Sequence, residues 1–126
     1  MTNIAALPLV DRVCQDAEPI ATIYRNLGTS AAEQLVTRAL AELGLAMAGL
    51  AQQVRLHDLT DVSRQLRKVQ RMAEHLGMVS LGRVADDART CFDCSDVTAF
   101  SAVWARLIRV AERSLATERD VRDQSV

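Results

Sequence analysis

Aromatic residues are scarce in this chain: one tryptophan, one tyrosine and two phenylalanines make up 3% of its 126 residues. The core must therefore be built from leucine, valine, alanine and methionine, which suits helices packed on helices and argues against a β-sandwich. Prolines and glycines are also few, two and five respectively, so long helices can run without interruption. These shortages predict an all-α protein.

Membrane-spanning and secretory patterns are missing from the sequence as well. The most apolar run, Leu43 to Ala51, is much shorter than the roughly 20 apolar residues that a membrane-spanning helix needs. This run instead predicts a helix segment that is buried on all sides. No basic stretch followed by an apolar one opens the chain, and the number of cysteines, three, is odd. We therefore expect a cytoplasmic protein with reduced thiols.

No catalytic or ligand-binding motif stands out. Cys91 and Cys94 form one C-x-x-C pair, but a zinc site of this kind needs a second pair at suitable spacing. The sequence has neither of the common phosphate-binding glycine loops and no His-Glu-x-x-His. We therefore expect no metal and no cofactor, while redox activity of the two thiols stays open. The net charge of −1 argues against polyanion binding by the whole surface, but leaves room for a local basic patch.

Four segments have the periodicity of amphipathic helices, and a further helical piece precedes them. The segments span residues 30–55, 58–76, 78–91 and 96–117. Because the connections are short, neighbouring helices should be antiparallel. The sequence thus predicts a single domain over residues 1–126: an antiparallel four-helix bundle with an N-terminal helical extension. Its core is expected at about 8–117, followed by a polar C-terminal tail at 118–126.

Individual residues mark the expected ends and contacts of these helices. Pro19 should break or restart the first helical region, because proline lacks the backbone N–H of a helix interior. Ser30 fits the start of a capping box, and Ser95 fits the N-cap of the last helix. Gly44 and Gly49 are expected where a neighbouring helix approaches closely.

The segment from Asp58 to Gly77 (DLTDVSRQLRKVQRMAEHLG) has the strongest helical signal. At about 100° per residue, its apolar and basic residues fall in two opposite arcs. The apolar arc, which we expect to face the core, contains Leu59, Val62, Leu66, Val69, Ala73 and Leu76. The basic arc, which we expect to face outward, contains Arg64, Arg67, Lys68, Arg71 and His75. That outer arc is either a solvated surface or a binding site for an acidic partner.

The order of elements resembles the histidine-containing phosphotransfer (HPt) domains of bacterial two-component relays, over roughly residues 8–117. In that family, one helix of an antiparallel four-helix bundle carries H-x-x-K-G, followed at a fixed interval by another glycine and a series of apolar residues. Gly77 matches the later glycine. The apolar series is matched by Leu81, Val84 and Ala88. The resemblance implies a signalling module of a phosphorelay.

The phosphoacceptor motif itself departs from the family pattern. Counting back from Gly77 puts Arg67 at the histidine, Gln70 at the lysine and Arg71 at the small glycine. An arginine cannot act as the nucleophile because its guanidinium stays protonated. This departure favours a non-catalytic role, in which an acidic partner docks on the helix without accepting or donating phosphate.

The resemblance also implies a partner. In the family, this helix face binds receiver domains of response regulators, whose phosphorylation pocket is lined by acidic residues. We therefore expect a receiver domain or another acidic protein to contact the basic arc, and expect neither membrane nor nucleic acid as a partner. Two alternatives stay open: phosphotransfer through a non-standard histidine, His75, or a helical interaction protein or homodimer unrelated to phosphorelay.

Overall fold

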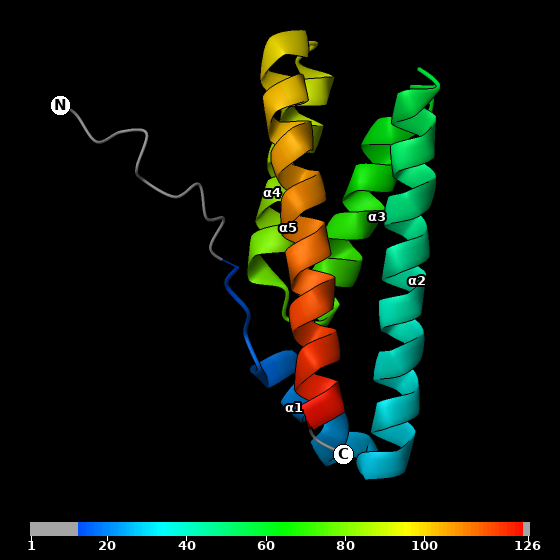
Figure 1. Cartoon of the computed structure of the whole chain (residues 1–126), viewed down its shortest axis with the longest axis vertical. Coiled ribbons are helices and arrows are strands. Elements are labelled where there is room, and N and C mark those ends of the chain that lie inside the picture. Colours follow the sequence, from blue (N-terminus) through cyan, green and yellow to red (C-terminus); the bar gives the residue numbers. More distant parts are fainter. Residues whose placement is uncertain (1–12, 125–126) are drawn as a thin grey trace, which may run out of the picture.

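The computed structural model describes residues 13–124, with side chains as far as Glu118, and every regular element in this part of the chain is a helix. The helices are α1 (Glu18–Leu27), α2 (Thr29–Arg55), α3 (Val62–His75), α4 (Val79–Asp93) and α5 (Val97–Gln124). Helices α2 to α5 alternate in direction, and α1 lies at the end where α2 begins (Figure 1). The predicted all-α bundle with an N-terminal helical extension is thus confirmed.

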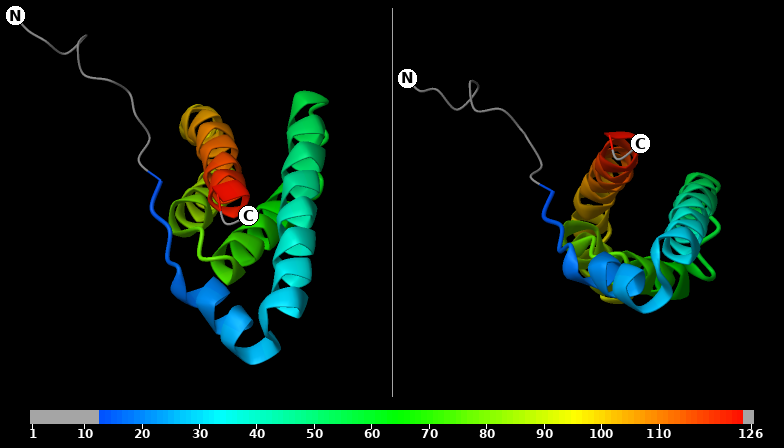
Figure 2. Two further views of the ribbon diagram at one scale, coloured as in Figure 1. Left: turned by 60° about the horizontal axis from the view of Figure 1, so that its bottom comes forward. Right: turned by 90° about the horizontal axis from the view of Figure 1, so that it is seen from below.

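Each helix packs chiefly on the next one in the sequence. The most extensive contacts join α3 to α4 and α4 to α5, whereas α2 and α5 touch only slightly. Seen along the bundle, α2 and α5 stand apart as two arms, with α3 and α4 joining them (Figure 2). The bundle is therefore less closed between α2 and α5 than between the other neighbouring helices.

The core is almost entirely aliphatic. Leu66 and Val69 of α3 are fully buried, which confirms the predicted rotation of this helix. Partly buried aromatic residues, among them Phe100 and Trp104, pack against the margin of this core. The core residues are Val36, Leu43, Met47, Leu50, Val62, Leu66, Val69, Ala73, Leu76, Met78, Leu81, Val84, Ala85, Ala88, Leu107, Val110 and Ala111.

Helix α3 begins later than the periodicity predicted. Its first residue is Val62, and Leu59, expected in the apolar arc, lies in the preceding turn with 43% of its surface exposed. Asp61 stands at the N-cap position but makes no capping hydrogen bond. Its carboxylate instead binds the guanidinium of Arg64 at 3.0 Å. Residues 58–61, which the sequence pattern assigned to the helix, therefore belong to the turn before it.

Two predictions about helix α2 are wrong. It begins at Thr29, and no side chain caps its first turn, so the capping box at Ser30 does not form. The run Leu43–Ala51 is not buried on all sides, because Leu45 is 73% exposed while Leu43 and Met47 face the core. Helix α2 is thus an ordinary amphipathic helix that leaves apolar side chains, Leu45 above all, in solvent.

Neighbouring segments approach the backbone closely at Gly77 and Gly82, and not at Gly44 and Gly49 as predicted. A Cβ atom placed on Gly44 or Gly49 would meet no neighbouring atom within 4 Å, so the predicted helix contact there is wrong. At Gly82, in contrast, a Cβ would lie 3.3 Å from Cγ of Glu74, which shows how closely α3 and α4 pack. Gly77 is crossed by the segment that precedes α1.

That N-terminal segment is hydrogen-bonded to the turn between α3 and α4. The amide of Asp16 donates to the carbonyl of Gly77 at 2.7 Å, and the amide of Ser80 donates to the carbonyl of Cys14 at 3.2 Å. The amide of Cys14 donates to Oγ of Ser80 at 2.6 Å. Helix α1 then begins at Glu18 with Pro19 in its first turn, so the predicted helix boundary at Pro19 is confirmed.

Helices α2, α3 and α4 end in the same way. The second residue after each helix has positive φ: His57 (57°), Gly77 (73°) and Ser95 (57°). Each of these turns has the two backbone hydrogen bonds of a Schellman motif, such as Met78 N–H to Ala73 O at 2.8 Å. Ser95 therefore terminates α4 and does not cap α5, which corrects the prediction. The cap of α5 is Asp96, whose Oδ1 accepts the amide of Ala99 at 3.0 Å.

Two further boundaries differ from the prediction. Helix α4 continues to Asp93, two residues past the expected end at 91, because its Schellman turn follows Asp93 directly. Helix α5 continues to Gln124, so the predicted polar tail from residue 118 is in part helical. The start of the predicted core, at residue 8, lies outside the described residues.

Candidate partner-binding face on α3

The five predicted site residues all lie on the exposed side of α3. We call Arg64, Arg67, Lys68, Arg71 and His75 the basic face. Together with Met72 they line a shallow hollow of about 220 Å³. Because Leu66 and Val69 anchor the opposite side of the same helix in the core, the basic face cannot turn inward without unpacking the bundle.

The cations of the basic face differ in whether they are already paired. Arg64 binds Asp61 through an i, i+3 ion pair at 3.0 Å. No ion pair formed by the described side chains, residues 13–118, involves Arg67, Lys68 or Arg71. The centre of the face therefore presents three positive charges that no carboxylate of this part of the chain offsets. Such charges raise the local potential and attract an acidic surface.

The side of α3 that faces α4 has a different character. Gln70 donates a hydrogen bond to Glu74 at 3.3 Å, and both residues line a second hollow, of about 350 Å³, between α3 and α4. Asp86 lines the same hollow and forms an ion pair with Arg89 at 2.7 Å. On its α4 side the basic face is thus bordered by a hollow of mixed charge, to which Glu74, Asp86 and Arg83 contribute.

The three positions counted from the HPt motif do not line the same hollow. Arg67 and Arg71, at the acceptor histidine and the small glycine, line the basic hollow. Gln70, at the motif lysine, lines the hollow toward α4. His75 is exposed at the C-terminal end of the basic face, whereas His57 is exposed in the turn after α2 and belongs to neither hollow. The centre of the basic face therefore holds arginine and lysine, and its histidine lies at one end.

Met72 is a member of the hollow that the sequence reading missed. At the pitch of an α-helix it falls between the basic and the apolar arcs, about 80° from Arg64, so it belonged to neither. Its partly buried side chain packs against the core and lines the hollow at the same time. Met72 follows Arg71 and lies one turn after Lys68, and from this spacing an apolar residue beside the basic arc could have been predicted.

Other kinds of site find little support in the described residues. Within residues 13–118, no three His, Cys, Asp or Glu side chains lie close enough together to hold a metal ion. Cys91 is half-buried and Cys94 is exposed, and both are free thiols. Among residues 13–124, none of the helices combines the length and apolar character that crossing a membrane requires.

Comparison with known proteins identifies no relative. No protein-family model, no curated protein and no solved structure matches this chain.

Proposed function

We propose that this protein is a non-catalytic binding module, organised like an HPt domain, whose basic face docks on an acidic partner. A receiver domain of a response regulator is the first candidate. The observation that carries the proposal is that Arg67, Lys68 and Arg71 are exposed on one helix with no ion pair to residues 13–118.

Unpaired cations are suited to binding because they have no internal partner to release. Arg67 and Arg71 are one helical turn apart, and each guanidinium can bind a carboxylate through two parallel hydrogen bonds. Arg64 must first exchange its bond to Asp61, so its contribution to affinity should be smaller. Like-charged neighbours on one helix also repel each other, and an acidic partner relieves that repulsion.

The test is a titration with purified receiver domains from the same organism, measuring Kd at low and at high salt. Wild-type protein should bind one of them more weakly as salt rises, because salt screens exposed charges. The double variant Arg67→Glu with Arg71→Glu should weaken binding by about tenfold or more, since two attractive contacts become repulsive.

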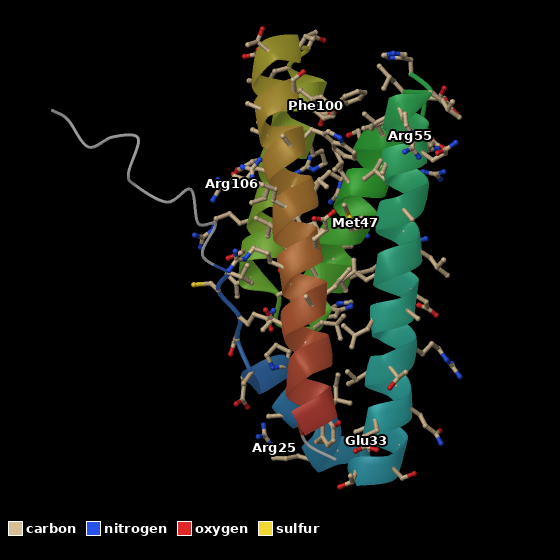
Figure 3. The ribbon with its side chains drawn as sticks, in the orientation of Figure 1. Arg25, Glu33, Met47, Arg55, Phe100 and Arg106 are labelled. Atoms are coloured by element: carbon tan, nitrogen blue, oxygen red, sulfur yellow. The ribbon has the colours of Figure 1, made fainter. Side chains whose placement is uncertain are left out.

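A matched control is available on α5. Arg106 and Arg113 are exposed, and Arg106 points away from α2 (Figure 3). The double variant Arg106→Glu with Arg113→Glu changes the net charge by the same amount and should keep wild-type affinity. If both double variants lost affinity equally, general charge and not the basic face would be responsible, and the proposal would fail.

Phosphotransfer through His75 is the second candidate, favoured by the exposure of this histidine within the basic hollow. Incubation with a phosphorylated receiver distinguishes the two. We expect no acid-labile, base-stable label on this protein, since residue 67 is an arginine. A label that disappears in His75→Gln but remains in His57→Gln would establish the second candidate and overturn the first.

A further inference from the structure

An apolar hollow of about 360 Å³ opens at one end of the bundle, where the turn between α2 and α3 meets the turn between α4 and α5. Phe92 and Phe100 contribute aromatic rings to it, and Leu59 and Val97 contribute aliphatic side chains. Phe100 lies near the upper end of α5, at the same end of the molecule as Arg55 of α2 (Figure 3). This hollow is lined by none of the residues of the basic face.

The walls of the hollow are held in place by packing and by hydrogen bonds. The rings of Phe92 and Phe100 meet edge to face with centroids 5.6 Å apart, and Phe100 stacks on Trp104 at 5.9 Å. The Schellman turn after α4 and the Asp96 cap of α5 fix the backbone between the two rings. The hollow is therefore preformed, so a ligand would lose little free energy in shaping it.

Part of this apolar surface is left in water. Leu59 is 43% exposed and Val97, the first residue of α5, is 76% exposed. Covering such surface with another apolar group releases the water around it and is favourable. Exposed apolar surface around a preformed hollow with a polar rim is characteristic of a contact site for another molecule.

The surroundings of the hollow are acidic. The two segments that form it, residues 56–63 and 91–100, contain four aspartates and neither lysine nor arginine. Asp61 and Asp93 have arginine partners, at 3.0 and 3.6 Å. Asp96 lines the hollow and Asp58 precedes Leu59, and neither forms an ion pair with the described side chains. A cation beside the hollow would therefore find carboxylates to bind.

We infer that this hollow is a docking site for a segment of a partner protein that presents an aliphatic side chain next to lysine or arginine. The aliphatic side chain enters between Leu59, Val97 and the phenylalanine rings, and the cation faces Asp96 and Asp58. The charge preference is opposite to that of the basic face. The two surfaces therefore select different segments, and this inference does not depend on the proposed function.

The single tryptophan provides a direct readout. Trp104 stacks on Phe100, so a side chain that enters the hollow changes the environment of the only indole in the chain. The probes are three helical peptides of one length, composed of leucine and lysine, leucine and glutamate, or serine and lysine. We expect a saturable change in Trp104 fluorescence with the leucine–lysine peptide and none with the other two. Equal responses to leucine–lysine and serine–lysine, or to leucine–lysine and leucine–glutamate, would overturn the inference.

A matched pair of variants locates the binding. Val97 and Val79 are both exposed valines at the first position of a helix, but only Val97 lines the hollow. Val97→Lys should weaken the leucine–lysine peptide by about tenfold or more, because it removes apolar contact and adds repulsion. Val79→Lys should leave the affinity unchanged. Unaltered binding to Val97→Lys would contradict the inference. Concentration-dependent dimerisation that Val97→Lys abolishes would instead identify a second copy as the occupant.

Discussion

The carbonyl oxygen of Asp16 occupies the space that a side chain at position 77 would need. A Cβ atom built on Gly77 would overlap this oxygen, and the φ of Gly77 is +73°. The amide of Asp16 also donates to the carbonyl of Gly77 at 2.7 Å. Two independent constraints, backbone conformation and the crossing segment, therefore require glycine at this turn.

Replacing this glycine should destabilise the fold. Gly77→Ala is expected to lower the free energy of unfolding by about 2–4 kcal/mol, combining the positive φ with the displacement of Asp16 and the loss of its hydrogen bond. Urea unfolding followed by circular dichroism measures the change. A loss below about 0.5 kcal/mol would show that the N-terminal segment does not cross the turn as described.

Gly49 should respond in the opposite direction. It is exposed in the interior of α2, and no atom lies within 4 Å of a Cβ placed there. Gly49→Ala should raise the free energy of unfolding by about 0.5–1 kcal/mol, because alanine loses less backbone entropy in a helix. The same unfolding experiment measures it, and a decrease would mean that another helix does approach this position.

The Schellman turn after α4 contains an avoidable strain. Ser95 adopts a φ of 57°, a conformation that residues with a Cβ adopt at a cost and glycine adopts freely. Ser95→Gly should therefore raise the melting temperature, by an amount equivalent to about 0.5–1 kcal/mol. Ser101→Gly is the control, since Ser101 is exposed inside α5 and glycine there should destabilise by about 0.5 kcal/mol. Changes of the same sign in both variants would contradict this account.

The rotation of α3 can be tested independently of any partner. Leu66 is fully buried and Arg71 is exposed. Leu66→Ala should destabilise the protein by about 2–5 kcal/mol, as expected for truncating a buried leucine. Arg71→Ala should change stability by less than about 0.5 kcal/mol. Denaturant midpoints for the two variants would be reversed if the helix presented its other side to the core.

The rotation of helix α3 could be predicted, and that of α2 only in outline, for one physical reason. In α3 the residues opposite Leu66 and Val69 are charged, so only one rotation buries the apolar side chains. In α2, leucine and alanine occur nearly all around the helix, so periodicity alone did not separate Leu35, which is 42% exposed, from Val36, which is buried. The choice is made by the neighbouring helices, whose positions the sequence pattern does not contain.

Turns and glycines were predicted less well, since their roles depend on contacts between distant segments. Gly77 is the last residue of the segment with the strongest helical signal, but the crossing of Asp16 could not be foreseen from either residue. Serine is a common N-cap residue, yet Ser95 belongs to the Schellman turn that ends α4, where its amide donates to the carbonyl of Phe92. The cap then moves by one residue to Asp96.

The basic face could be predicted from the sequence, whereas the apolar hollow could not, because only the hollow depends on contacts between distant segments. The basic face belongs to one helix, so helical pitch alone placed Arg67 and Arg71 side by side. The apolar hollow combines Leu59 with Phe92 and Val97, residues from two turns that are distant in the sequence. The pattern assigned Leu59 to the core of α3, and only the late start of that helix brings it to the rim of the hollow.

The slight contact between α2 and α5 has a consequence for how the chain folds. Because each helix packs mainly on its successor, most contacts between helices join elements that are consecutive in the sequence. Folding then requires the closure of few long loops, which places the chain among topologies that fold within microseconds to milliseconds. We expect the pair formed by α3 and α4, which has the most extensive contacts, to form first and α2 and α5 to pack on it afterwards.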